Sequence, residues 1–240
     1  MCEECLAAIE PVRAPQCVLC GDRLAGAQLL MGDGRCVNCR DQQPEFERAV
    51  SFGEYEAELR GLIHLLKYES VMPVAGPLGG LLAQAIQELL RGRQDAPPLM
   101  IPVPLHKRRR RTRGFNQAEL IARLAARQCS PRLEAATDVL ERRRDTISQV
   151  GLSREERIAN VRDAFGVANP GRVAGRSVIV VDDVMTTGTT LSECARVLKQ
   201  AGAERVWAAT VARAFHGVDP GVADPGEEEA IEAAEVAASV

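Results

Sequence analysis

Two adjacent carboxylates stand between an apolar run and a loop of small hydroxyl residues, and this arrangement is the most chemically suggestive one in the chain. Residues 177–181 read Ser-Val-Ile-Val-Val, Asp182 and Asp183 follow, and residues 186–190 read Thr-Thr-Gly-Thr-Thr. A continuous apolar run is typical of a buried parallel strand, and open α/β sheets bind ligands at the carboxyl ends of such strands. A loop that opens a helix can aim backbone N–H groups at a phosphate, and the two acids can accept hydrogen bonds from sugar hydroxyls. The pattern therefore predicts a cradle for a ribose phosphate.

Residue types exclude two other phosphate-binding loops. A Walker A loop needs Gly-Lys-Ser/Thr, and a dinucleotide fingerprint needs three glycines, whereas this stretch has no lysine and only Gly188. An ordinary strand–turn–helix with a threonine N-cap is the structural alternative. The residues expected to bind the phosphate are Val184, Met185, Thr186, Thr187, Gly188, Thr189 and Thr190.

Six of the eight cysteines form Cys-x-x-Cys pairs within the first forty residues. In a reducing cytoplasm such pairs favour a metal over disulfides. Two pairs supply the four thiolates that a closed, tetrahedral structural zinc site needs. We expect one complete zinc site on Cys17, Cys20, Cys36 and Cys39.

The first pair, Cys2 and Cys5, is left without a second pair. Either it binds metal weakly, or an upstream pair has been lost from the chain. A redox-active dithiol is the alternative for any of the pairs, and more so for this one. Cys129 and Cys194 stand alone at helical spacing and are expected in the core.

The composition suits one medium-sized domain with a small appendage. The chain has 240 residues, of which 46% are hydrophobic and only 3% aromatic, so the core must be built from Leu, Val, Ile and Ala. The apolar runs fall well short of the roughly 20 residues that cross a membrane, and no basic-then-apolar leader opens the chain. We therefore expect a cytoplasmic protein without membrane insertion.

The chain divides into three parts by composition. Residues 1–42 have too few apolar side chains for a core and are expected to be a zinc ribbon stabilised by its metal. Residues 46–215 alternate strand and helix patterns, which predicts a parallel sheet flanked by helices. Residues 216–240 form an acidic tail that is expected to be disordered. Within this frame we predict helices over 54–68, 78–90, 116–127, 153–160 and 189–200, and strands over 99–103, 139–142, 178–182 and 205–212.

A strongly basic run follows the first predicted strand. Residues 102–106 read Pro-Val-Pro-Leu-His, and residues 107–113 read Lys-Arg-Arg-Arg-Arg-Thr-Arg. At the carboxyl end of a strand this run would reach the same sheet edge as Asp182. Guanidinium groups bind phosphate oxygens in a bidentate manner. A solvated charge run or a nucleic-acid patch is the alternative.

These motifs resemble known proteins. The stretch 178–190 is similar to the loop of type I phosphoribosyltransferases that binds phosphoribosyl diphosphate (PRPP), with its four apolar residues, two acids and closing Thr-Gly-x-Thr. The ordered set of motifs resembles the ComF family, which joins a zinc ribbon to a phosphoribosyltransferase domain and includes members associated with DNA uptake in natural transformation. The matching motifs are the Cys-x-x-Cys start, Leu66-Lys67-Tyr68, Pro102 to His106, Arg113-Gly114-Phe115-Asn116-Gln117 and the PRPP loop.

The resemblance implies a type I phosphoribosyltransferase fold and magnesium-dependent pentosyl transfer from PRPP to an acceptor that the sequence does not reveal. Asp182 and Asp183 would be the catalytic acids that hold the ribose hydroxyls. Arg109 and Arg113 would attract the diphosphate, and His106 would contact it. Magnesium would bridge the diphosphate oxygens.

Residues 145–165 take the place of the mobile hood that covers the reacting centre in type I enzymes. Arg157, or its neighbour Arg154, would close onto the diphosphate. The alternative for Arg157 is an ion pair with a glutamate on the same helix surface. The acidic tail beyond residue 215 lies outside the resemblance.

A binding module is the rival to an enzyme. Such a protein would keep PRPP or a nucleotide as a sensed ligand, while the zinc ribbon and the basic run contact single-stranded DNA or a helicase-like protein partner. Aromatic side chains on which single strands stack are nearly absent from residues 1–42. This weakens direct DNA binding by the ribbon and leaves protein docking open.

Overall fold

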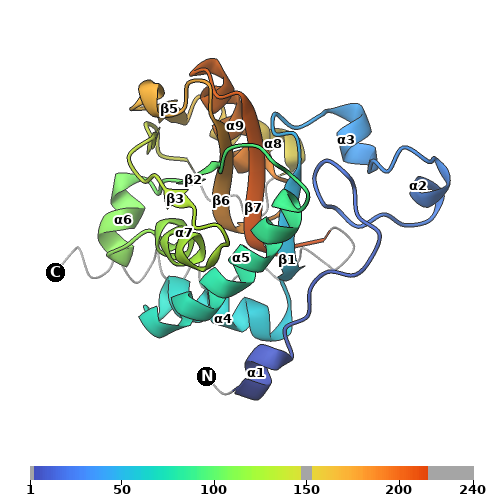
Figure 1. Ribbon diagram of the computed structural model, residues 1–240, viewed down its shortest axis with the longest axis horizontal. Coiled ribbons are helices and arrows are strands. Elements are labelled where there is room, and N and C mark those ends of the chain that lie inside the picture. The colour runs from blue at the N-terminus through green and yellow to red at the C-terminus, as the bar shows by residue number, and fades with distance from the viewer. Residues whose placement is uncertain (1–2, 147–152, 216–240) are drawn as a thin grey trace.

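The apolar runs of the chain form a five-stranded parallel sheet in a computed structural model that describes residues 3–146 and 153–215 (Figure 1). The strand order is β1-β7-β6-β2-β3, and every neighbouring pair is parallel. The strands are β1 (Ala49–Glu54), β7 (Arg205–Arg213), β6 (Ser177–Met185), β2 (Leu99–Pro102) and β3 (Glu134–Ala135). The predicted parallel α/β sheet is confirmed.

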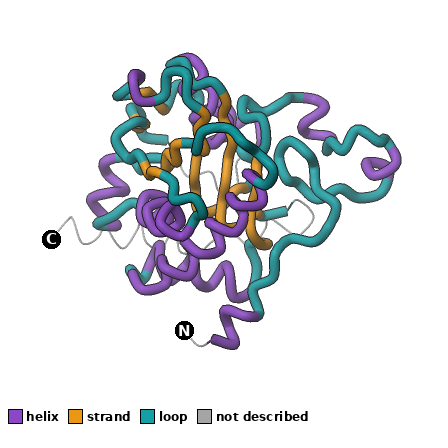
Figure 2. The backbone as a smooth tube through the Cα atoms, viewed as in Figure 1, coloured by secondary structure: helices purple, strands orange, loops and turns teal. Residues whose placement is uncertain are grey.

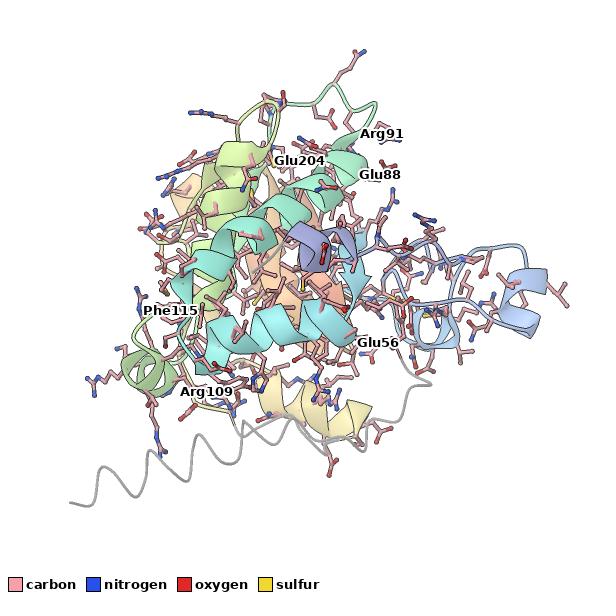
Figure 3. The ribbon with its side chains drawn as sticks, turned by 90° about the horizontal axis from the view of Figure 1, so that it is seen from below. Glu56, Glu88, Arg91, Arg109, Phe115 and Glu204 are labelled. Carbon is pink, nitrogen blue, oxygen red and sulfur yellow. The ribbon has the colours of Figure 1, made fainter. Side chains whose placement is uncertain are left out.

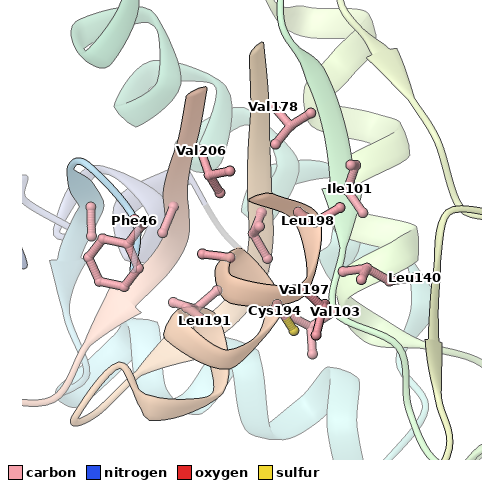
Figure 4. Packing of buried hydrophobic residues seen from close by; sticks show 14 of the residues in the cluster. Phe46, Ile101, Val103, Leu140, Val178, Leu191, Cys194, Val197, Leu198 and Val206 are labelled. Carbon is pink, nitrogen blue, oxygen red and sulfur yellow. The ribbon is translucent and has the colours of Figure 1, made fainter. Parts of the chain in front are cut away.

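Helices cover both faces of this sheet (Figures 1 and 2). One face packs against α4 (Ala57–Tyr68), α5 (Ala75–Leu90) and α7 (Gln117–Gln128). The other face packs against α9 (Thr189–Gln200), with α8 (Arg154–Val161) beside it. The side chains of β6 alternate between the two faces, because successive residues of a strand point in opposite directions. Figure 4 shows Cys194, Val197 and Leu198 of α9 packed near residues of the neighbouring strands, such as Ile101 and Val178.

The N-terminal segment lies along the free edge of β1. It contains the short helices α1 (Glu3–Ala7), α2 (Ala27–Leu30) and α3 (Val37–Asp41). The backbone N–H of Val12 donates to the carbonyl of Phe52 at 2.9 Å, and the N–H of Ala49 donates to the carbonyl of Leu19 at 2.7 Å. The segment is therefore hydrogen-bonded to the sheet at two points.

Short elements complete the described part of the chain. They are the 3₁₀ turns η1 (Met72–Val74) and η2 (Pro170–Arg172), the helix α6 (Lys107–Arg113) and the strands β4 (Leu140–Arg142) and β5 (Phe165–Val167). No helix in the described ranges is long and apolar enough to cross a membrane.

Several boundaries differ from the sequence-based predictions. The strand near 139–142 forms, but it pairs antiparallel with β5 in a separate two-stranded sheet rather than in the main one. The second helix begins at Ala75 and not at 78, because Pro77 lies in its first turn, where the missing N–H costs no hydrogen bond. The central strand runs three residues further, to Met185. The domain boundaries stay a prediction, and Cys2 and the tail at 216–240 lie outside the described residues.

Candidate functional site

The two acids lie at the carboxyl end of β6, the middle strand of the sheet. Pro102, the last residue of β2, lies opposite Val181, and β6 continues through Asp182 and Asp183 to Met185. The five strands of this sheet are all parallel, so their carboxyl ends share one edge, where such sheets bind ligands. Both acids therefore lie at the sheet edge that the sequence pattern predicts, and the strand includes Asp183 as well as Asp182.

Gly188 turns the chain from β6 into α9. Its φ of +77° lies in the left-handed region that favours glycine, and a Cβ there would lie 2.5 Å from the Met185 Cε. Gly188 is also the N-cap of α9, and no side chain caps the helix, so the alternative of a threonine cap is not observed. The hydroxyls of Thr187 and Thr189 lie 3.2 Å apart. With the N–H groups of the first turn, which have no partner within the helix, they form a turn suited to a phosphate.

The basic run forms the helix α6. The His106 side chain caps this helix by accepting from the N–H of Arg108 at 3.5 Å, and Gly114, with a φ of 81°, ends it. Arg109 and Arg113 are one helical turn apart and only partly exposed. Figure 3 shows Arg109 of α6 on the side of the molecule away from the cysteine-bearing segment.

The residues after α6 fix its position against the sheet. Asn116 caps α7 by accepting from the N–H of Ala118 at 3.0 Å, and its amide Nδ2 donates to the carbonyl of Val103 at 3.0 Å. Arg113 donates to the Gln117 side-chain oxygen at 2.7 Å. The Arg-Gly-Phe-Asn-Gln motif thus holds an arginine at the end of β2.

The helix α8 brings a further arginine to the loop. Ser153 and Glu156 form a capping box at its start. Arg157 Nη1 donates to the hydroxyl of Thr186 at 3.4 Å. Among the described residues Arg157 makes this contact rather than the alternative ion pair along the helix, because α8 packs against α9 beside the loop.

Acids, threonines and cations border one cavity of about 280 Å³. Its lining contains five cationic side chains and two acidic ones, so positive charge is in excess. These seven residues are Lys67, Arg109, Arg113, Arg142, Arg157, Asp182 and Asp183. Of the loop residues, Val184, Met185, Thr186, Gly188, Thr189 and Thr190 also border it.

The two acids have different surroundings. Lys67 at the end of α4 places its Nζ 3.0 Å from Asp183 Oδ2, and both side chains are almost entirely buried. Burial opposes ionisation of Asp183, but the lysine charge outweighs it and lowers the pKa of Asp183. Burial and the charge of Asp183 raise the pKa of Asp182 well above its ordinary value. Of the two acids, Asp183 is therefore the one whose charged form the fold favours.

A second cluster gathers four thiols. Cys17, Cys20, Cys36 and Cys39 are buried, and their sulfur atoms all lie within 4.8 Å of one another. A tetrahedral zinc with bonds of about 2.3 Å would space its sulfurs by about 3.8 Å. The Sγ atoms of Cys20 and Cys36 are 3.6 Å apart, so the cluster fits zinc. Within the described ranges no other such group of metal-binding side chains occurs, and Cys5 is exposed and not part of it.

Comparisons with known proteins agree with this geometry. A model of the phosphoribosyl transferase domain matches residues 118–230. The chain is 33% identical over 202 residues to Competence protein F of Haemophilus influenzae, covering 83% of this chain and 85% of that protein. The chain belongs to the ComF family. This ComF protein is also 34% identical over 210 residues to the DNA utilization protein YhgH of Salmonella typhimurium, covering 86% of this chain and 87% of that one. Among solved structures, it is similar to an allosteric regulatory enzyme of purine biosynthesis, with 22% identity, 56% and 24% of the two chains covered and a TM-score of 0.35.

The structure of this ComF protein brings together most of the residues singled out in its sequence. Two of those expected to bind the ligand do not border the cavity: His106, whose Nδ1 lies 3.2 Å from Asp145 Oδ1, and Thr187. Thr187 borders a second cavity behind the loop instead. Residues that sequence reasoning gave no role are Lys67, Arg142 and Tyr55, which line the cavity from distant elements. The sequence motif around Lys67 was recognised, but no residue near it in the chain predicts an ion pair with Asp183.

The second cavity, of about 230 Å³, separates the PRPP-like loop of this ComF protein from its cysteine cluster. Arg213, the last residue of β7, lies on its wall and is 2% exposed. Its Nη2 lies 3.6 Å from Asp22 Oδ1 and 3.8 Å from Cys20 Sγ. The arginine therefore supplies a buried positive charge beside the thiolates, where a zinc–four-thiolate group would carry an excess of negative charge.

Proposed function

We propose that this ComF protein binds PRPP in the 280 Å³ cavity and transfers its phosphoribosyl group to an acceptor. One observation carries the proposal: the acids and the Thr-Gly turn at the end of β6 border the same cavity as five cationic side chains. A sugar with phosphate at one end and diphosphate at the other needs this combination.

In this proposal the threonine loop and the first turn of α9 hold the 5-phosphate. Asp182 and Asp183 face the ribose. Arg109, Arg113 and Arg157 stabilise the diphosphate as the bond between ribose C1 and its oxygen breaks and the electron pair leaves with that oxygen. An acceptor then forms its bond to C1.

Magnesium would lower the charge of the leaving diphosphate. Among the described residues that line the cavity, only Asp182 offers it an accessible carboxyl group. Asp183 Oδ1 accepts from the N–H of Val184 at 2.9 Å, and its Oδ2 faces Lys67. The ion would therefore be held by Asp182 and mainly by the oxygens of PRPP itself.

Isothermal titration with PRPP, with and without Mg²⁺, tests binding, and diphosphate release in a screen of nitrogen-containing acceptors tests turnover. We expect micromolar binding, a clear loss for Arg109→Ala with Arg113→Ala, and little change for the exposed Arg132→Ala. Absence of PRPP binding by the zinc-loaded chain would exclude the proposal.

A non-catalytic adaptor is the second candidate function. The α6 residues Lys107, Arg110 and Arg111 are exposed, away from the two arginines that line the cavity. The relatives named for competence and for DNA utilization point to a DNA-handling process. In this proposal the ribbon docks DNA or a DNA-translocating partner while PRPP or a nucleotide is sensed.

Salt dependence and complementation separate the two functions. Binding of single-stranded DNA by the exposed face of α6 must weaken steeply with salt. An adaptor keeps its cellular role when Asp182 and Asp183 both become Asn, and loses it when Cys17 and Cys20 become Ser. An enzyme loses its role with the first change as well.

A further inference from the structure

Lys67 reaches the site from an element that carries none of the residues expected to bind the ligand. It lies in the last turn of α4, and its ammonium group is 3.0 Å from Asp183 Oδ2. The exposed fractions of the two side chains are 14% and 5%, so water does little to screen the pair. Both residues border the 280 Å³ cavity. The ion pair is thus part of the cavity wall.

The two acids differ in how their oxygens are occupied. Asp183 has a partner for each oxygen, since Oδ1 accepts from the N–H of Val184 and Oδ2 faces Lys67. Asp182 Oδ1 accepts from the N–H of Asp183 at 2.9 Å, and the side chain is partly exposed to the cavity. Asp182 therefore has the more accessible carboxyl group of the two.

This difference between the two carboxyl groups affects the binding of a polyanionic ligand. Adjacent buried carboxylates resist ionising together, and each unneutralised one repels phosphate. A lysine that neutralises the inner acid removes that repulsion while it holds the strand end in place. The next residue of the same helix, Tyr68, lies under the Arg113 guanidinium, 5.6 Å from ring centre to carbon. One turn of α4 therefore supports both the acidic and the basic side of the cavity.

We propose that Lys67 is a positioning residue that neutralises and anchors Asp183, which leaves Asp182 as the acid that contacts the ribose of the sugar phosphate. The assignment of the ribose rests on the proposed function, whereas the ion pair does not. A lysine that bound phosphate directly would be the competing role, and the two roles differ in what happens when both members of the pair are removed.

The test compares Lys67→Met, Asp183→Asn and the double variant, all zinc-loaded, by PRPP titration. Lys67→Met leaves a buried, uncompensated carboxylate facing a polyanion, so we expect at least a tenfold loss of affinity. The double variant removes that carboxylate and should return to within about threefold of wild type. Asp182→Asn should lower the affinity for PRPP both in wild type and in the double variant. If the double variant binds as weakly as Lys67→Met, the ammonium contacts the ligand and the inference is wrong.

Urea unfolding of the same variants keeps the inference testable without any ligand. The losses of stability in the two single variants should sum to clearly more than the loss in the double variant, since each single change strands a buried charge. Additive losses would overturn the pairing role. Lys199→Met, which removes a lysine 3.9 Å from the exposed Glu45, is the matched control and should change neither measurement. Failure of wild type to bind PRPP, with non-additivity intact, would count against the proposed function alone.

Discussion

The two ends of β7 allow a matched test of the link between the cysteine cluster and the sheet. Arg205 begins the strand and Arg213 ends it. Arg205 pairs with Asp95 at 3.2 Å on the surface, where the side chains are 41% and 52% exposed. Arg213 faces Asp22 at 3.6 Å with side chains only 2% and 10% exposed. The same substitution, Arg to Met, therefore removes one exposed and one buried charge.

The expected costs differ severalfold. Arg205→Met should lower the free energy of unfolding by less than about 1 kcal/mol, because water screens an exposed pair. Arg213→Met strands the buried Asp22 carboxylate beside the thiolates, and breaking such a pair costs about 3 kcal/mol. The pair distance of 3.6 Å is longer than a hydrogen bond, so we take the low end of the range for buried pairs.

Equilibrium urea unfolding of the zinc-loaded chain, followed by circular dichroism, measures both costs. Release of zinc to a chromophoric chelator should also be faster for Arg213→Met than for wild type, and unchanged for Arg205→Met. Equal costs for the two substitutions would refute the reasoning, because the buried charge would then carry no special role. A second substitution, Asp22→Asn in the Arg213→Met background, should recover part of the loss.

Three further outcomes are expected. Wild type should hold one zinc per chain by mass spectrometry under native conditions, and Cys36→Ser should hold none and melt at a lower temperature, because three thiolates do not close the tetrahedron. Gly188→Ala should weaken PRPP binding at least tenfold in titration, since a left-handed φ strains alanine and its Cβ meets Met185, whereas Gly171→Ala, with open space around it, should not. The pKa of Asp183 is lowered in the fold, so its contribution to stability is present above the ordinary aspartate pKa of about 3.9. The stability gap between wild type and Asp183→Asn should therefore be full at pH 7 and shrink as the pH falls below about 4, and a gap that stays constant would contradict the shift.

Local patterns predicted much of this molecule. The strand–acid–threonine stretch and the α9 helix after it depend on residues adjacent in the chain. The bounds of α9, Thr189 to Gln200, were predicted without error. The capping box at Ser153 is equally local. The close spacing of two cysteine pairs sufficed to identify the four-thiol cluster. In each case the chemistry and the backbone conformation are encoded within a few neighbouring residues.

What the sequence did not predict depends on contacts between distant segments. Lys67 meets Asp183 only because the fold brings the last turn of α4 to the carboxyl end of β6. The periodicity of the sequence does not predict such a contact. Arg213 and Cys20 are likewise far apart in the sequence and are brought together only by the fold. The basic run was judged by its charge, although arginine is a good helix former and Gly114 gives a stop signal. The strands β4 and β5 are three residues each, too short for an alternating pattern to assign them to a sheet.

The two hydrogen bonds between the N-terminal segment and β1 suggest how the protein would aggregate if it lost its metal. β1 is the outermost strand on its side, and the segment that closes the thiol cluster covers the row of backbone groups that this strand would otherwise present to solvent. An uncovered strand edge invites pairing with another molecule. Metal starvation should therefore be seen first as self-association of chains along β1, with the ligand cavity at the carboxyl end of β6 still formed.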